Sequence, residues 1–534
     1  MQLAASGGAR DPLSRPWAVP LLLAGLELAA FGIFSPRLGF YLDDWYFLEI
    51  LTRHPGYWAG IHALLAKGSA TRPVALLIQP LVFTLAGAAP MAFQCAMMAL
   101  DWLGAVLFHR FVSELTGDRA LALLSAALVV CLPIHPATHL WPSNMPQTTA
   151  QDLLLAGFIA HLRYVDTRSR RALLASMAFY LAGALCYESV TLLPAAMLLA
   201  LALRGSPSDG APSRRARAAL LDTSPYAVPF GAAMLWQWAG ARWVLHQTNP
   251  KAVHFSVLWA AVVYQRAVHS LVLGVPILAA IALASWRSYG AAAWLLMAAA
   301  GAAFGWAVSA ARRMPRRGSG TRPALGAALG FFLAGYAPYA LSGAYPPNIL
   351  GVMSRTSSSG SFALALVLAA AALGAVSMLA DGPRGASRLR GPVLAALTAA
   401  LLATAMVGDW WQAVQWGKAW SLQQAVLARV EARAKALPKD STLLLEGVPD
   451  QINGGVVFFT YWDWPAALRL RTGRQDLQGE VVPRKTLLLG DRIHWTSEGE
   501  ERSVPLAGTY VYDFQRDSLF DLRAAVAARQ SRRG

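Results

Sequence analysis

Apolar stretches of membrane length recur along most of this chain, and no other feature restricts its fold as strongly. A helix needs about 20 predominantly apolar residues to cross the hydrocarbon core of a bilayer. Windows approaching that length appear from Trp17 to about Val407, and only 14% of the 534 residues are charged. Soluble domains carry about 25% charged residues. The sequence therefore predicts a mostly α-helical, polytopic membrane protein with about 11–13 transmembrane helices.

The charge of the chain is strongly basic, with a formal net value of +17. Arginines cluster in short loops between apolar runs, at residues 163–171, 214–217, 312–317 and 384–390. This is the positive-inside pattern, which predicts that these loops lie in the cytoplasm. No nucleic-acid recognition motif accompanies the charge, so we expect membrane lipids and no nucleic acid as partners. The sequence therefore predicts a multi-pass protein of the bacterial inner membrane.

Two adjacent aspartates follow the first apolar segment. The first external loop, residues 37–90, opens with Asp43 and Asp44 and later presents His54 and Arg72. Neighbouring like charges repel, so one of the two carboxyls could hold a proton or share a cation. The alternative is a pair of solvated residues at a helix end. For Arg72 the alternative is contact with a phospholipid headgroup.

Further polar residues fall where apolar segments leave the membrane. They are His135 and His139 in a second external loop, Asp152 at the mouth of a crossing helix, Glu188 at a bend between two short helices, and Arg355 in the loop 342–361. Each has a plain structural alternative, since loop histidines are often structural and arginines contact headgroups.

Glu27 and Asp101 lie within apolar segments, where an ionisable side chain is costly and suggests function. One interpretation is a proton relay, as in a transporter. The other, which we favour, is that both are protonated and hydrogen-bonded between helices.

The middle of the chain leaves the number of crossings open. Segments 225–245, 270–286 and 291–311 resemble three crossings, yet the basic loops on either side should share one face of the membrane. Either residues 255–268 form a fourth, short crossing, or one of the three segments does not span.

The composition changes after Gly408. A helical stretch at 416–437 precedes short apolar runs at 443–445, 456–460, 486–489 and 509–512, separated by Gly, Pro and Asp. Residues 409–534 therefore predict a small α/β domain outside the membrane, on the periplasmic side, after a transmembrane domain at 1–408.

In this organisation the chain resembles the GT-C membrane glycosyltransferases, in particular the protein-mannosyltransferase and aminoarabinose-transferase types. The resemblance rests on Asp43-Asp44 opening the first external loop, on Arg72-Pro73-Val74, and on His135-Pro136 followed by His139. Relatives often show Lys-Glu where this chain has Tyr187-Glu188, so Glu188 matches and Tyr187 does not.

The resemblance implies an inverting glycosyltransferase with a polyprenyl-phosphate sugar donor and a lipid, glycan or protein acceptor. Asp43 would be the general base, and Asp44 its partner or a ligand of a divalent cation. Arg72 and Arg355 would hold the leaving phosphate. The remaining candidates for substrate contact are His54, His135, His139, Asp152 and Glu188.

Two other function classes fit parts of the pattern: a transporter or flippase for lipid-linked glycans, and a glycan polymerase or ligase relying on Arg and His. The position of the acid pair favours the transferase. The sequence shows no internal repeat, which argues weakly against a transporter, and no P-loop, which argues against a nucleotide-driven pump.

Overall fold

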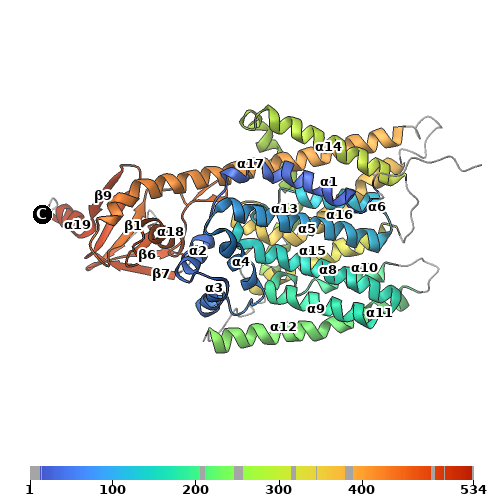
Figure 1. The fold of residues 1–534 in the computed structure, drawn as a ribbon, viewed down its shortest axis with the longest axis horizontal. Helices are drawn as coiled ribbons and strands as arrows, with labels where there is room; N and C mark the ends of the chain where they lie inside the picture. Colours follow the sequence, from blue (N-terminus) through green and yellow to red (C-terminus); the bar gives the residue numbers. More distant parts are fainter. Residues whose placement is uncertain are drawn as a thin grey trace, which may run out of the picture.

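The structure is a computed structural model in which a helical bundle carries a smaller, β-containing C-terminal domain at one end (Figure 1). We call that end of the bundle the domain face. The structure describes residues 13, 15–204, 211–245, 256–313, 320–343, 345–378, 389–482, 487–497 and 500–531. Part of the basic clusters, including Arg316, Arg317, Arg384 and Arg388, lies outside these residues.

Seven helical stretches of the described chain are long and apolar enough to cross a membrane. They are α1 with the turns after it (Ala18–Arg37), α5 (Pro90–Thr116), α13 (Val257–Ala284), α14 (Ala291–Arg312), α15 (Arg322–Ser342), α16 with the turn before it (Val352–Met378), and α17 (Arg390–Lys435). Shorter or more polar helices pack beside them: α6 (Arg119–Cys131), α8 (Met145–Thr167), α9 (Arg170–Cys186), α10 (Pro194–Ala202) and α12 (Ala227–Ala239). The mostly helical, polytopic fold is confirmed, and the predicted number of about 11–13 transmembrane helices stays a prediction beside the seven candidate spans.

Helix α13 explains the odd number of apolar segments in the middle of the chain. It is one continuous helix that joins two stretches considered separately above. Near its start Trp259 donates a hydrogen bond to the carbonyl of Tyr339, at the end of α15 (3.1 Å). Further along, Gly274 packs against Ile134, just after α6, and Leu278 faces Gly408 of α17. The helix thus lies across the ends of its neighbours, and it links α12 to α14 without following either through the bundle.

Loops at the end opposite the C-terminal domain are tied together by ion pairs, and we call this end the basic face. Arg312, at the end of α14, pairs with Asp118 before α6 (3.1 Å). Arg204, after α10, pairs with Asp166 of α8 (2.9 Å). Arg163 approaches Glu114 of α5 (3.8 Å). Figure 1 shows α11 (Pro212–Thr223) at this end too. The clustered arginines that are described therefore share one face, as the positive-inside pattern predicts.

The C-terminal domain is built on a four-stranded sheet with the order β4-β1-β8-β9. Central β1 (Thr442–Glu446) runs parallel to β4 (Gln478–Val481) and β8 (Thr509–Asp513), and β9 (Ser518–Asp521) is antiparallel to β8. A two-stranded sheet pairs β2 (Gln451–Ile452) with β3 (Gly455–Val456). In a three-stranded sheet, β6 (Arg492–Ser497) lies between β5 (Leu487–Leu489) and β7 (Glu500–Pro505). The predicted α/β class is confirmed. The predicted boundary after Gly408 falls inside α17, which continues unbroken from the bundle into this domain.

The domain is bound to the bundle through α2 (Asp43–Arg53), which packs against α18 (Asp463–Thr472). Glu49 of α2 is buried and accepts two hydrogen bonds from the guanidinium of Arg469, at 2.5 and 2.8 Å. Arg53 contacts the same carboxylate. The helix that begins with Asp43 is therefore held from its far end by the C-terminal domain.

Replacing Arg469 with glutamine should destabilise the protein by about 3 kcal/mol, because a buried carboxylate loses its bidentate partner. The matched control is Arg471→Gln on the same helix. Arg471 is exposed and pairs with Glu431, so its loss should cost less than about 1 kcal/mol. Denaturant unfolding of both variants in detergent measures the difference, and equal effects would contradict a buried pair at Glu49.

Candidate active site

Asp43 is the first residue of α2, at the N-terminus of a helix, where the backbone dipole favours a negative charge. The residue before it, Leu42, has φ of +49°. This left-handed region is unfavourable for a residue with a side chain, and such strain clusters at functional sites. The local fold therefore sets the direction of Asp43 at some energetic cost.

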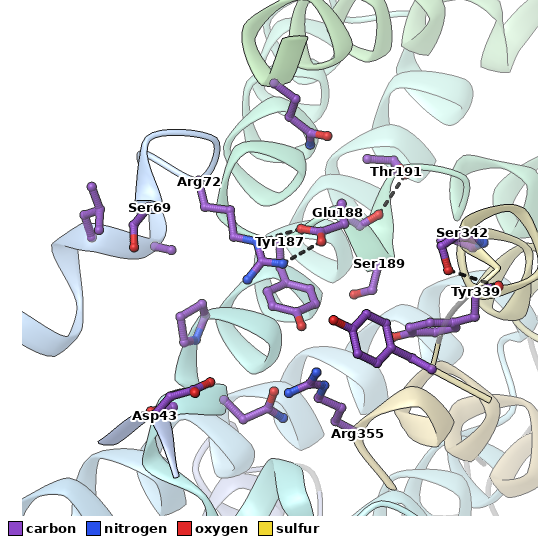
Figure 2. Close-up of a pocket in the computed structure, with 18 of the residues that line it drawn as sticks. Asp43, Ser69, Arg72, Tyr187, Glu188, Ser189, Thr191, Tyr339, Ser342 and Arg355 are labelled. Atoms are coloured by element: carbon purple, nitrogen blue, oxygen red, sulfur yellow. Dashed lines mark hydrogen bonds and ion pairs between the residues drawn. The ribbon is translucent and has the colours of Figure 1, made fainter. Parts of the chain in front are cut away.

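A cavity of about 820 Å³ opens beside Asp43. Four charged side chains line it, and they come from distant parts of the sequence: Asp43, Arg72, Glu188 and Arg355. Figure 2 shows the Arg72–Glu188 pair across the hollow from Asp43 and Arg355. The structure thus brings together four of the residues singled out from the sequence.

Arg72 is fixed by the bend between α9 and α10. Its guanidinium donates two hydrogen bonds to Glu188, at 2.7 and 2.5 Å, and it lies 4.1 Å from the ring centre of Tyr187. An arginine held on two sides presents its remaining N–H groups in a fixed direction. Glu188 is thus positioned to orient Arg72.

Arg355 enters the cavity from the turn before α16. Its guanidinium lies over the rings of Trp141 (5.2 Å) and Tyr345 (5.5 Å). Within the described part of the chain no acidic side chain forms an ion pair with it. Stacking on two rings therefore holds the group, and its hydrogen-bond donors are left for an anion in the cavity.

The carboxylate of Asp43 accepts a hydrogen bond from the indole N–H of Trp462, in the C-terminal domain (2.9 Å). Burial raises the pKa of Asp43 above its ordinary value, while Arg355, the Trp462 hydrogen bond and Arg72 each act to lower it. A carboxylate whose pKa lies above its ordinary value is better able to accept a proton than an exposed aspartate.

Asp44 is turned away from the cavity and is buried. Successive helical residues point about 100° apart, and here that step turns the second carboxyl toward Ser143 and the backbone of Tyr41. Its carboxyl accepts hydrogen bonds from the backbone N–H of Tyr41 (2.7 Å) and from the hydroxyl of Ser143. Burial raises the pKa of Asp44 to about 8, against the lowering effect of these hydrogen bonds. Its role as a catalytic partner stays a prediction.

The predicted divalent cation at Asp44 also stays a prediction. Among the described residues, no third acidic, histidine or cysteine side chain lies close enough to this pair to complete a three-ligand set.

The other predicted site residues lie elsewhere. His135, His139 and Asp152 are buried and line a separate, small polar pocket of about 30 Å³. His54 is exposed at the end of α2 and does not line the cavity. Their contact with substrate remains a prediction that the cavity lining does not support.

Sequence reasoning missed several residues that shape the site. Trp462 reaches Asp43 from a different domain, and Ser143 holds Asp44. Tyr339 and Tyr345 line the cavity beside Arg355. The available signal for Trp462 was the aromatic run at 461–464, within a domain otherwise rich in charged residues.

No protein-family model matches the sequence, and no curated protein matches it either. Among solved structures, the chain is similar to a crystal structure of ArnT from Cupriavidus metallidurans bound to undecaprenyl phosphate. The two share 13% sequence identity and a TM-score of 0.41, over 88% of this chain and 87% of that one. A second crystal structure, of the same protein in the apo state, matches with 13% identity and a TM-score of 0.38, over 88% and 86% of the two chains.

Proposed function

We propose that this protein is an integral-membrane glycosyltransferase that moves a sugar from a polyprenyl-phosphate donor to an acceptor at the domain face. The observation that carries the proposal is the shared cavity, in which the carboxylate of Asp43 faces the guanidinium groups of Arg72 and Arg355. A base next to two phosphate-binding cations is the set of groups that transfer from a phosphate-linked sugar requires.

The roles follow from the chemistry of the reaction. The donor phosphodiester carries one negative charge, and the leaving polyprenyl phosphate gains a second as the sugar–oxygen bond breaks. Arg355 and Arg72 stabilise that developing charge, which is what accelerates the chemical step. Asp43 accepts the proton of the acceptor hydroxyl as its oxygen attacks the anomeric carbon from the opposite face, so the configuration inverts.

The proposed orientation places the basic face in the cytoplasm and the cavity and the C-terminal domain in the periplasm of a bacterial inner membrane. Alkaline phosphatase fused after Gly534, a residue outside the described chain, should therefore be active, because that enzyme matures only outside the cytoplasm. A fusion in the basic loop after Arg204 should be inactive. The reverse pattern in these two fusions would overturn the orientation.

The function itself is tested in two steps. Mass spectrometry of lipid-linked sugars from a deletion strain should show one polyprenyl-phosphate sugar accumulating, and the wild-type chain should reverse this. Purified protein in proteoliposomes, given that donor on the domain side, should then release free polyprenyl phosphate in step with glycosylated acceptor. A flippase would move the donor without cleaving it, so intact donor in this assay would exclude the transferase.

A further inference from the structure

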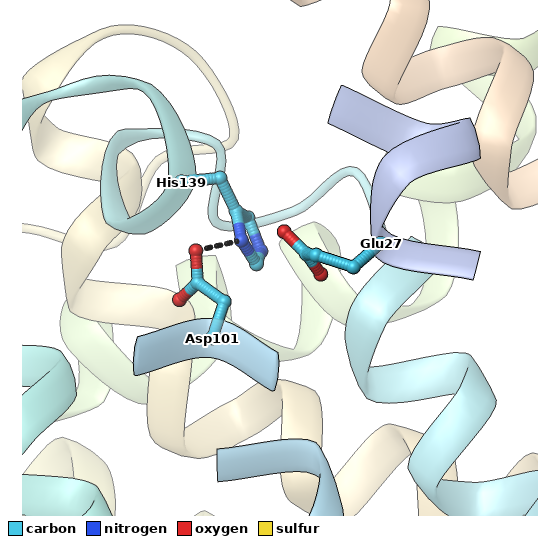
Figure 3. A group of neighbouring side chains, drawn as sticks. All are labelled: Glu27, Asp101 and His139. Carbon is cyan, nitrogen blue, oxygen red and sulfur yellow. Dashed lines mark hydrogen bonds and ion pairs between the residues drawn. The ribbon is translucent and has the colours of Figure 1, made fainter. Parts of the chain in front are cut away.

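A second group of polar side chains lies inside the bundle, apart from the cavity. Glu27 at the end of α1, Asp101 in α5 and His139 in α7 (Ala137–Leu140) meet there (Figure 3). Each offers a ligand atom, and these atoms all lie within 4.8 Å of one another. The exposed fractions of the three residues are 2%, 9% and 4%. Three segments distant in sequence thus converge on one buried point.

The hydrogen bonds within the group are incomplete. The Nδ1 atom of His139 lies 2.9 Å from Asp101 Oδ2. The Nε2 atom of the same ring and both carboxylate oxygens of Glu27 are buried and have no hydrogen-bond partner in the described part of the chain. A buried polar atom without a partner costs about 1–3 kcal/mol, and more when it is charged. Three such atoms at one point form a set of donor atoms that a bound cation would satisfy.

Protonation does not satisfy the group. A protonated Glu27 would have to donate its O–H to an acceptor, and neither of its oxygens has a hydrogen-bond partner among the described residues. This argues against the hydrogen-bonded arrangement that the sequence favoured for Glu27. A cation would satisfy Glu27, Asp101 and His139 together and would offset the repulsion between the two carboxylates.

We propose that Glu27, Asp101 and His139 bind one divalent transition-metal ion inside the bundle. Two carboxylates and one imidazole form a ligand set of oxygen and nitrogen atoms. This set suits Zn²⁺ or Mn²⁺ better than cations that prefer oxygen ligands only. Bonds from the metal to its ligands are about 2.0–2.2 Å long, so the three ligand atoms must move somewhat closer together than they are here. Side-chain shifts of under about 1 Å would be enough. The neighbouring 30 Å³ pocket, lined by Asp101, His139 and Asp152, has room for a water molecule as a further ligand.

The ring of His139 is held in place for this role. It stacks on Phe31 at 4.3 Å, with an angle of 15° between the planes. Trp141 and Ser143 lie on the same segment shortly after His139, and they contact Arg355 and Asp44, respectively. A metal at His139 therefore fixes the segment that forms one wall of the cavity. The proposal does not depend on the proposed glycosyl transfer, because it concerns the metal content and stability of the chain.

The test is the metal content of the full-length protein, purified in detergent without added metal and passed through gel filtration after brief exposure to EDTA. Elemental mass spectrometry should find about one equivalent of one transition metal per chain, and below about a tenth of that in Glu27→Gln and His139→Gln. The matched control is His161→Gln. His161 is a buried histidine whose ring nitrogens also lack partners, but it is not part of this group, so the variant should keep its metal.

Thermal unfolding gives a readout that does not depend on purification history. After exhaustive chelation, adding Zn²⁺ or Mn²⁺ should raise the Tm of the wild type and of His161→Gln, because the ion binds only the folded chain. The Tm of Glu27→Gln should not respond. Wild-type protein that loses its metal to brief EDTA, or that shows the same Tm with and without added metal, would overturn the proposal, as would a Glu27→Gln variant that retains a full equivalent.

Discussion

Replacing Asp43 with asparagine is expected to lower the rate constant of sugar transfer by at least about 100-fold, the lower range of what a positioned general base contributes. Asparagine has the same shape and still accepts the hydrogen bond from Trp462, so folding and donor binding should change little. The measurement is single-turnover transfer with saturating donor, alongside a direct donor-binding assay. The control is Asp491→Asn, an exposed carboxylate of the C-terminal domain, which should leave the rate unchanged.

The pH dependence of the rate gives an independent check on Asp43. A base works only when ionised, so kcat/KM should fall as the pH is lowered through the pKa of Asp43. Burial raises that pKa above the ordinary value of 3.8, so the fall should begin at a higher pH than for an exposed aspartate. The residual activity of Asp43→Asn should not show this decrease at low pH. Near wild-type turnover in the variant, or an unchanged acid limb, would remove Asp43 from the base role.

Replacing Arg355 with glutamine should weaken donor binding by about 10- to 100-fold. A hydrogen bond to a charged group is worth about 1.5–3 kcal/mol, and about 1.4 kcal/mol corresponds to a factor of ten. The rate should fall as well, because the charge on the leaving phosphate grows during the reaction. Lysine at this position restores the charge but cannot stack between Trp141 and Tyr345, so Arg355→Lys should recover only part of the loss.

The matched control for Arg355 is Arg287→Gln. Arg287 also lies over a tryptophan ring, that of Trp286 at 5.6 Å, but it is outside the cavity lining. A role limited to phospholipid headgroups would give the two variants similar, small effects on donor binding. Only a large effect confined to Arg355 agrees with a phosphate site in the cavity.

The class of fold could be predicted from the sequence, because the length of an apolar segment and the charge of a loop are both local properties of the sequence. It also indicated the bend at Glu188, which separates α9 from α10. The orientation of α13 relative to the other helices could not be predicted from the sequence in the same way. Its length and apolarity match those of a crossing helix, and only its contacts with Tyr339, Ile134 and Gly408 reveal that it lies across the bundle.

The sequence predicted the site residues that lie close together in one loop. It did not predict the contacts between residues that are far apart in the sequence. Asp43 and Arg72 stand out within one loop. The sequence does not indicate that Glu188 pairs with Arg72, 116 residues away, or that Trp462 donates to Asp43 from 419 residues away. The adjacent Asp44 looks equivalent in the sequence, and the helix that begins at Asp43 turns it into the protein interior.

The most direct test of the account is an electron cryomicroscopy structure of the full chain in lipid nanodiscs with added polyprenyl phosphate. The account predicts phosphate density inside the cavity, within about 3 Å of the guanidinium groups of Arg72 and Arg355, with the Asp43 carboxylate facing the same space. Phosphate bound outside the cavity, with Asp43 turned to bulk solvent, would contradict it.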